Sequence, residues 1–443
     1  MLIFIFMLIA LGCAVAVYRW RWGIFAAIIV GLLQDPLRKM VPGVPGYLAM
    51  CSVPIWLTVL GMAIASGRLS IRPFLSGFPK LARWIVIFGC YLLIPAVISF
   101  SYGQGSWKIT LLGALVYSAS FLMLAVGWKF PMSEQSILKV LIFYVLCAAV
   151  LLVGGPLDYF DLGSGHPTIG TEVFDTLWVT YRTGDAVYMY SGFFRSPDVM
   201  GWHAAMVVMV SGLLAIRSRS RMRWVWIAIS MWGFLNLWIC GRRKMIAMLP
   251  VFGAIYLFLI FRFRNVSRVI PVAAMLLLVA GVGWYGATRT YHETAMDTFY
   301  ESTLGDLNER VAGHGYKAVV QTIRQAGFFG YGLGMGQQGI HHIQADKPKL
   351  WQEGGLGKMV AELGIPGAIL FLCAGGVLML TAYHVAGYLA GDFSLYTYVG
   401  LFSLLGANAA SAVVSAQIFG DLFIILFLVF LTGILLSGSR RNK

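Results

Sequence analysis

Thirteen apolar runs of helical length divide the sequence, and polar residues are largely confined to the segments between them. About 20 consecutive apolar residues in an α-helix cross a hydrocarbon core, so each run is a candidate membrane span. The second run is short and the last two are crowded, so twelve to fourteen helices are expected. The runs are 2–18, 20–33, 47–65, 84–101, 109–127, 137–154, 198–216, 223–240, 245–261, 269–287, 364–383, 395–413 and 420–437.

The composition agrees with this pattern. Of the 443 residues, 59% are hydrophobic and 12% are charged, whereas soluble domains are about half apolar and about 25% charged. A soluble globular enzyme is therefore excluded, and an all-α polytopic membrane protein is predicted. The formal net charge of +15 is expected from basic cytoplasmic loops and does not indicate a nucleic-acid partner. The six cysteines include no CxxC pair, so neither a disulfide framework nor a zinc site is implied.

Loop charges predict the orientation. When the helices are threaded in order, four basic clusters fall on one side, which is therefore cytoplasmic. The uncharged N-terminus then faces outward, and the first helix is retained rather than cleaved as a signal peptide, because basic residues follow it instead of preceding it. The clusters are Arg68, Arg72, Lys80 and Arg83; Arg217, Arg219, Arg221 and Arg223; Arg262, Arg264 and Arg268; and Arg440, Arg441 and Lys443.

The threading divides the chain into five parts. Residues 1–154 are N-terminal transmembrane helices, 155–197 a first outer loop, 198–287 central transmembrane helices, 288–356 a second outer loop and 357–443 C-terminal transmembrane helices. In the second loop, helical periodicity from residue 309 to 324 places five polar side chains on one stripe, and a glycine-rich turn follows. The stripe is Arg310, His314, Lys317, Gln321 and Arg324, and the glycines are 327, 330, 332, 334, 336 and 339.

One short connection breaks the charge rule. Arg242, Arg243 and Lys244 fall on the outer side, because two apolar runs separate them from basic clusters on either hand. A misplaced helix is the alternative explanation. If the threading is right, a phosphate or diphosphate at the headgroup level is the natural ligand.

Arg195 is a further outer cation. It precedes a proline at the expected start of a membrane helix, where the helix N-terminus also favours anions. A salt bridge with Asp198 or Asp185 is an equally good interpretation.

Four segments follow one another between about residues 190 and 385: GFFRSPDVMGWHAAMVVMVSGLLA, GRRKMIAMLPVFGAIYLFL, ERVAGHGYKAVVQTIRQAGFFGYGLGMG and GGLGKMVAELGIPGAILF. Their order resembles the C-terminal half of O-antigen ligases and of Wzy-type O-antigen or exopolysaccharide polymerases. The resemblance implies a glycosyltransferase of the bacterial inner membrane that acts on the periplasmic side. The positions that match the family pattern are Arg243, Arg310, Gly330, Gly332 and Gly334.

The resemblance also implies the reaction. A glycan passes from undecaprenyl diphosphate to a hydroxyl of an acceptor, with no cofactor and no metal, and with arginines stabilising the departing diphosphate. The implied partners are the lipid-linked oligosaccharide donor, a glycan or lipid acceptor, membrane lipids, and a chain-length regulator or other envelope polysaccharide assembly proteins. The candidate diphosphate-binding residues are Arg195, Arg242, Arg243, Lys244, Arg310, Lys317 and Arg324.

The base is the open part of the mechanism. Ligases carry a histidine shortly before the last of these motifs, where this sequence has Glu353. Desolvation near the apolar boundary can raise the basicity of a carboxylate, so Glu353 is the first candidate and His314 the second. His341 or His342 could serve instead, and Glu353 could also be a surface carboxylate paired with a lysine. His203, inside a membrane helix, is expected to be structural.

Two other functions are compatible with the hydropathy. A transporter or flippase of lipid-linked sugars is disfavoured because the predicted spans have almost no charges at their centres. A scaffold for envelope assembly does not explain the outer arginines. Two sizeable outer loops favour a polymerase over a ligase.

Overall fold

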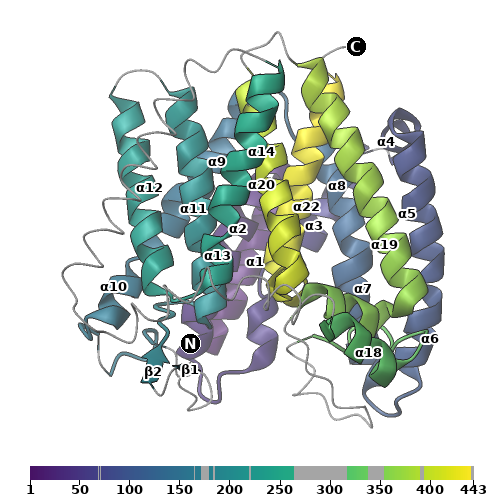
Figure 1. The fold of residues 1–443 in the computed structure, drawn as a ribbon, viewed down its shortest axis with the longest axis horizontal. Helices are drawn as coiled ribbons and strands as arrows, with labels where there is room; N and C mark the ends of the chain where they lie inside the picture. The colour runs from purple at the N-terminus through teal and green to yellow at the C-terminus, as the bar shows by residue number, and fades with distance from the viewer. Residues whose placement is uncertain are drawn as a thin grey trace.

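The computed structural model describes residues 1–67, 69, 71–163, 165–170, 179–182, 185–218, 221–263, 317–337, 354–389 and 394–440; of 179–182, 185–187 and 243 it describes the main chain alone. These residues form a bundle of packed helices (Figure 1). A short antiparallel hairpin pairs Val179 with Tyr188 and Arg182 with Asp185. The protein is an all-α polytopic membrane protein, as predicted.

The elements follow the predicted runs. The run at 269–287 lies outside the described residues, and each of the other twelve coincides with helix. The elements are α1 (Leu2–Tyr18), α2 (Trp20–Lys39), η1 (Gly46–Met50), α3 (Val53–Ala65), α4 (Ile71–Gly77), α5 (Pro79–Tyr91), α6 (Leu93–Phe100), α7 (Ser106–Ala114), η2 (Leu115–Ala119), α8 (Ser120–Lys129), α9 (Glu134–Leu151), α10 (Gly154–Tyr159), β1 (Val179–Arg182), β2 (Asp185–Tyr188), α11 (Pro197–Arg217), α12 (Met222–Ile239), α13 (Arg243–Ile246), α14 (Met248–Phe263), α18 (Ala318–Ala326), α19 (Gly355–Tyr388), α20 (Leu395–Val414), α21 (Gln417–Gly420), α22 (Leu422–Leu436) and η5 (Ser437–Arg440).

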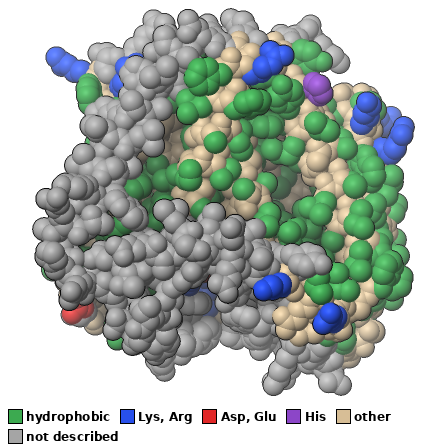
Figure 2. Space-filling model, in the orientation of Figure 1, with side chains coloured by type: hydrophobic (Ala, Val, Ile, Leu, Met, Phe, Trp, Pro, Cys, Tyr) green, Lys and Arg blue, Asp and Glu red, His purple; other side chains and the backbone are tan. Residues whose placement is uncertain are grey.

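The bundle has the surface of a membrane protein. Within the described part of the chain, nine helices are long and apolar enough to cross a membrane, and the apolar α1 is shorter. Large apolar side chains such as Ile3, Val97 and Phe258 point outward, each more than 60% exposed. Figure 2 shows hydrophobic side chains over the middle of the visible face and Lys and Arg toward its edges. This distribution suits a lipid-facing surface between two polar ends.

The interior is packed around α11 and α22. Both helices are almost fully buried, and α22 packs closely on α8 through glycines. A Cβ at Gly127 would collide with the Phe430 carbonyl, and one at Gly433 with the Leu124 carbonyl. Small residues therefore let two membrane helices approach at backbone distance.

The two ends of the bundle differ. The N-terminus, α10, the hairpin, α13 and α18 lie at one end, and the C-terminus lies at the other (Figure 1). At the C-terminal end, Arg440 donates to the carbonyl of Trp128 and Arg21 to that of Phe130. We call the end that holds the N-terminus the loop end, and the end that holds the C-terminus the arginine end. The described parts of the two connections and the basic turn lie at the same end of the bundle (Figure 1).

Candidate functional site

A buried ion cluster joins three distant parts of the chain at the loop end. The Arg195 guanidinium contacts Asp35 Oδ1 at 3.2 Å and Asp421 Oδ2 at 2.5 Å, and all three side chains are at least 90% buried. Burial opposes the charge, but the carboxylates of Asp421 and Asp35 outweigh it and raise the pKa of Arg195 above its ordinary value. Arg195 is therefore a structural cation that ties α2 to the starts of α11 and α22.

This geometry favours the ion-pair interpretation of Arg195 over a diphosphate ligand. Its partners are Asp35 and Asp421. Asp198, which lies near Arg195 in the sequence, pairs with Lys244 instead. The physical reason is that both ends of the guanidinium fork are already occupied by carboxylates.

The first connection is also fastened one helical turn beyond Asp35 of this cluster, at the end of α2. Lys39, in the last turn of α2, donates to the carbonyls of Gly170 at 2.7 Å and Gly192 at 2.8 Å. Asp158 accepts from the amides of Ser191 and Gly192 at 3.0 and 2.9 Å. An ammonium has three donors and a carboxylate can accept several, so one lysine and one aspartate hold the backbone at residues 170, 191 and 192.

The basic turn is gathered around one carboxylate. Helix α11 begins at Pro197 with Ser196 as its cap, and Asp198 lies in its first turn. Asp198 Oδ1 lies 2.8 Å from Lys244 Nζ, and Oδ2 lies 3.3 Å from an Arg242 nitrogen. Arg242 and Lys244 remain partly exposed. Two cations of the basic turn therefore share one carboxylate at the loop end.

Of the other predicted ligands, some are placed and some are not. Arg243 begins α13, although its side chain is not described. Lys317 and Arg324 are exposed, and Thr322 faces inward, so the predicted stripe is confirmed over the described part of its helix. Arg310, His314 and Glu353 lie outside the described residues, as do His341 and His342.

The glycine turn lies in a slot between α6, α7 and the start of α19. Gly330, Gly332 and Gly334 all have positive φ, at 76°, 99° and 80°. The Tyr331 amide donates to the Ala361 carbonyl at 2.7 Å, and the Leu333 amide donates to the Pro95 carbonyl at 3.0 Å. Side chains at these glycines would collide with neighbouring backbone. The predicted return of the chain is confirmed, and its docking surface was not predicted.

Sequence reasoning missed the polar pair beneath this turn. Lys358 and Glu362, four residues apart on α19, are 1% and 0% exposed. Glu362 accepts from the Tyr117 hydroxyl at 2.6 Å and from the Gly336 amide at 2.8 Å. Their spacing on one face of a helix was the available signal, because a Lys and a Glu so placed inside an apolar segment need buried partners.

His203 has the expected structural role. It is 2% exposed, and its Nδ1 lies 2.8 Å from the Tyr144 hydroxyl oxygen. All six cysteines are free. In the described ranges, no three side chains of the metal-binding types come together.

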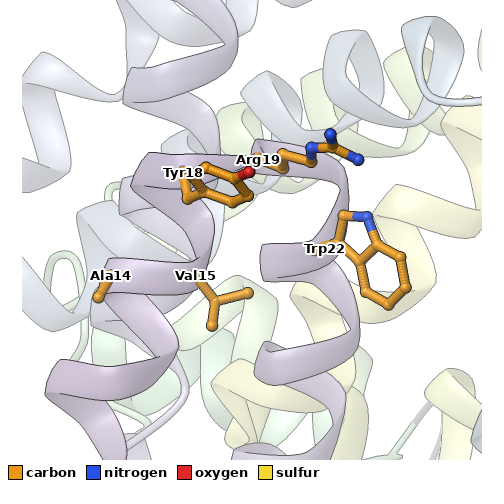
Figure 3. Close-up of a pocket in the computed structure, with 5 residues that line it drawn as sticks. All are labelled: Ala14, Val15, Tyr18, Arg19 and Trp22. Carbon is orange, nitrogen blue, oxygen red and sulfur yellow. The ribbon is translucent and has the colours of Figure 1, made fainter.

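A surface pocket of about 560 Å³ lies elsewhere, at the elbow between α1 and α2. It is lined by Ala14, Val15, Tyr18, Arg19 and Trp22, and the Arg19 guanidinium lies over the Tyr18 ring (Figure 3). The elbow includes Arg21, which contacts Phe130 at the arginine end. The pocket is therefore separate from the charged groups at the loop end.

Comparison with known proteins adds no family: no family model matches the chain, and no curated protein matches it. The geometry at the loop end, together with the motif order between residues 190 and 385, carries the functional argument.

Proposed function

We propose that this protein is a membrane glycosyltransferase that polymerises lipid-linked repeat units into O-antigen or exopolysaccharide. The observation that carries the proposal is the gathering of two cations of the basic turn, Arg242 and Lys244, on Asp198 at the loop end of the bundle, opposite the arginine end. Cations placed against the charge rule favour an anionic ligand at the headgroup level. A diphosphate-linked lipid has that charge and that depth.

The reaction uses these groups in simple roles. The acceptor hydroxyl oxygen attacks the anomeric carbon of the donor glycan, the bond from that carbon to the diphosphate oxygen breaks, and the hydroxyl proton passes to a base. Undecaprenyl diphosphate leaves, and cations at its oxygens stabilise the charge that develops there. In this proposal Arg243 and Arg310 grip the diphosphate, Arg242 and Lys244 add positive charge, and Lys317 and Arg324 lie on the exposed face of the second loop.

The direct test is product formation. Purified protein in lipid vesicles, given an undecaprenyl-diphosphate-linked repeat unit, should produce a ladder of longer glycans. A single transfer to lipid A core, with no ladder, would instead identify an O-antigen ligase. Absence of any new glycosidic bond with both acceptors would refute the proposal.

A second candidate function is supported by a specific observation. The described helices bury charges, and α19 is interrupted at Gly364, where φ is +69°. Buried charges and broken helices are typical of transporters, and a flippase was disfavoured because almost no charges were expected at the centres of the spans. A flippase would move the lipid-linked sugar across a vesicle bilayer without forming a glycosidic bond. This movement can be measured in the same vesicles.

The diphosphate site gives a prediction about arginine chemistry. Replacing Arg243 or Arg310 with lysine keeps the charge but removes the planar fork that donates two parallel hydrogen bonds. We expect turnover to fall about 10- to 100-fold, as for the loss of a hydrogen bond to a charged group. Arg221→Lys, at the far end of α12 from the basic turn, is the control. Wild-type turnover in both site variants would assign the two arginines to folding or orientation.

Sidedness gives a second prediction. In a variant without the six native cysteines, Leu162→Cys, at a position 72% exposed at the loop end, should react with a membrane-impermeant thiol reagent added to intact cells. Ser76→Cys, on the exposed side of α4, should react with the reagent only after the cells are lysed. The reverse pattern would place the basic turn on the cytoplasmic side, where basic residues are expected without a diphosphate ligand.

A further inference from the structure

The buried carboxyl group of Glu362 holds together three parts of the chain. It lies on α19 and accepts from Tyr117 of η2, and from the amide of Gly336 and the side-chain amide of Gln337 at 2.8 and 3.4 Å. Gly336 and Gln337 are the last described residues of the glycine turn. A carboxyl group can accept several hydrogen bonds, so Glu362 attaches more than one group at a single point.

Lys358 completes the cluster. It lies one helical turn before Glu362, and its Nζ donates to the Phe419 carbonyl at 2.8 Å. Phe419 is in α21, two residues before Asp421 of the Arg195 cluster. Helix α21 therefore links Lys358, which lies beside the glycine turn, with the Arg195 cluster.

The fit of the turn over this pair is close. A Cβ at Gly336 would lie 2.8 Å from Lys358 Cγ and 3.2 Å from Glu362 Oε1. Gly364 breaks α19 just beyond, and the Ile365 amide that this break redirects donates to the Phe328 carbonyl at 2.9 Å. Both ends of the turn are thus bonded to α19.

We propose that Glu362 is the positioning residue of the second loop, and that Lys358 supports it. The carboxyl group clamps the glycine turn to α19 and η2, and in the sequence this turn lies between the predicted groups Arg310 and Glu353. The clamp itself is independent of the reaction; its effect on turnover rests on the proposed function.

The clamp is tested by hydrogen exchange on the purified full-length protein. Glu362→Gln keeps the shape but replaces one acceptor oxygen with an amide nitrogen that can only donate, so amides of residues 331–336 should exchange about tenfold faster. Amides of α11 should be unchanged. Gln321→Ala, on the exposed face of α18, is the matched control and should leave the turn protected.

A double variant separates positioning from simple charge pairing. Lys358→Met with Glu362→Gln removes the buried lysine that the single change leaves without its carboxylate. If pairing were the whole role, this variant would recover both stability and protection of the turn. The clamp predicts recovery of stability without recovery of protection. Slow exchange of the turn in the folded single and double variants would overturn the inference.

If neither Glu362 variant folds, Gly336→Ala provides a third test. Its Cβ would collide with Lys358 and displace the turn, although Glu362 and Lys358 are both retained in the sequence. Unchanged exchange of the turn in this variant would also overturn the inference. In the ladder assay, Glu362→Gln should lower turnover about tenfold with donor affinity within about twofold of wild type. A protected turn without any ladder in wild type contradicts the proposed function alone, whereas a normal ladder with a loosened turn contradicts positioning.

Discussion

Replacing Arg195 with methionine should remove most of the folded protein. The change leaves Asp35 and Asp421 buried with no cation between them, and breaking a buried pair in this way costs about 3–5 kcal/mol. Arg195→Lys should be intermediate, because one ammonium cannot reproduce a fork that contacts two carboxylates. The measurement is the thermal unfolding midpoint of the detergent-purified protein, together with its yield.

Two comparisons make the Arg195 prediction specific. Arg324→Met removes an exposed arginine of α18 and should leave the midpoint unchanged. Adding Asp421→Asn to Arg195→Met removes one stranded charge while an asparagine can still cap α22, so part of the loss should be recovered. A midpoint for Arg195→Met equal to that of wild type would contradict the structural role and reopen Arg195 as a diphosphate ligand.

Replacing Glu353 with glutamine should abolish glycan transfer. Glutamine keeps the shape and removes the basicity, and a positioned base contributes about 100- to 10,000-fold to the rate. Donor binding and yield should stay unchanged, since the diphosphate site does not include Glu353. The measurement is the initial rate of ladder formation at saturating donor.

His314→Ala is the paired test. Normal polymerisation by Glu353→Gln, together with an inactive His314→Ala, would move the base to the histidine, which is expected one helical turn from Arg310. Full activity in both variants would mean that the reaction proceeds by diphosphate stabilisation without a side-chain base.

The sequence predicted the helices well because a helix that crosses a membrane requires an apolar run of matching length. Apolar runs of helical length coincide with helix wherever the structure describes them. The largest error is the start of α19, expected at residue 364 and found at Gly355. Helix α2 also continues past residue 33 to Lys39, because the polar residues Asp35 and Lys39 beyond the predicted run find buried partners.

The charged centres could not be predicted in the same way. The partners of Arg195 are 160 and 226 residues away along the chain, and no local pattern connects positions so far apart. The glycine turn was visible in the sequence, yet its contacts with Pro95 and Ala361 depend on the packing of α6 against α19. Hydropathy predicts which segments enter the membrane, while the pairing of buried charges follows from tertiary structure.

The most direct test of the glycosyltransferase account is the stoichiometry of the reaction. Vesicles containing the purified protein and the lipid-linked repeat unit, without ATP or nucleotide sugar, should release one undecaprenyl diphosphate for each new glycosidic bond. That ratio should hold as the ladder lengthens, because each transfer breaks one bond to diphosphate. New bonds without release of undecaprenyl diphosphate, or movement of the lipid-linked sugar across the bilayer with no new bond, would contradict the account.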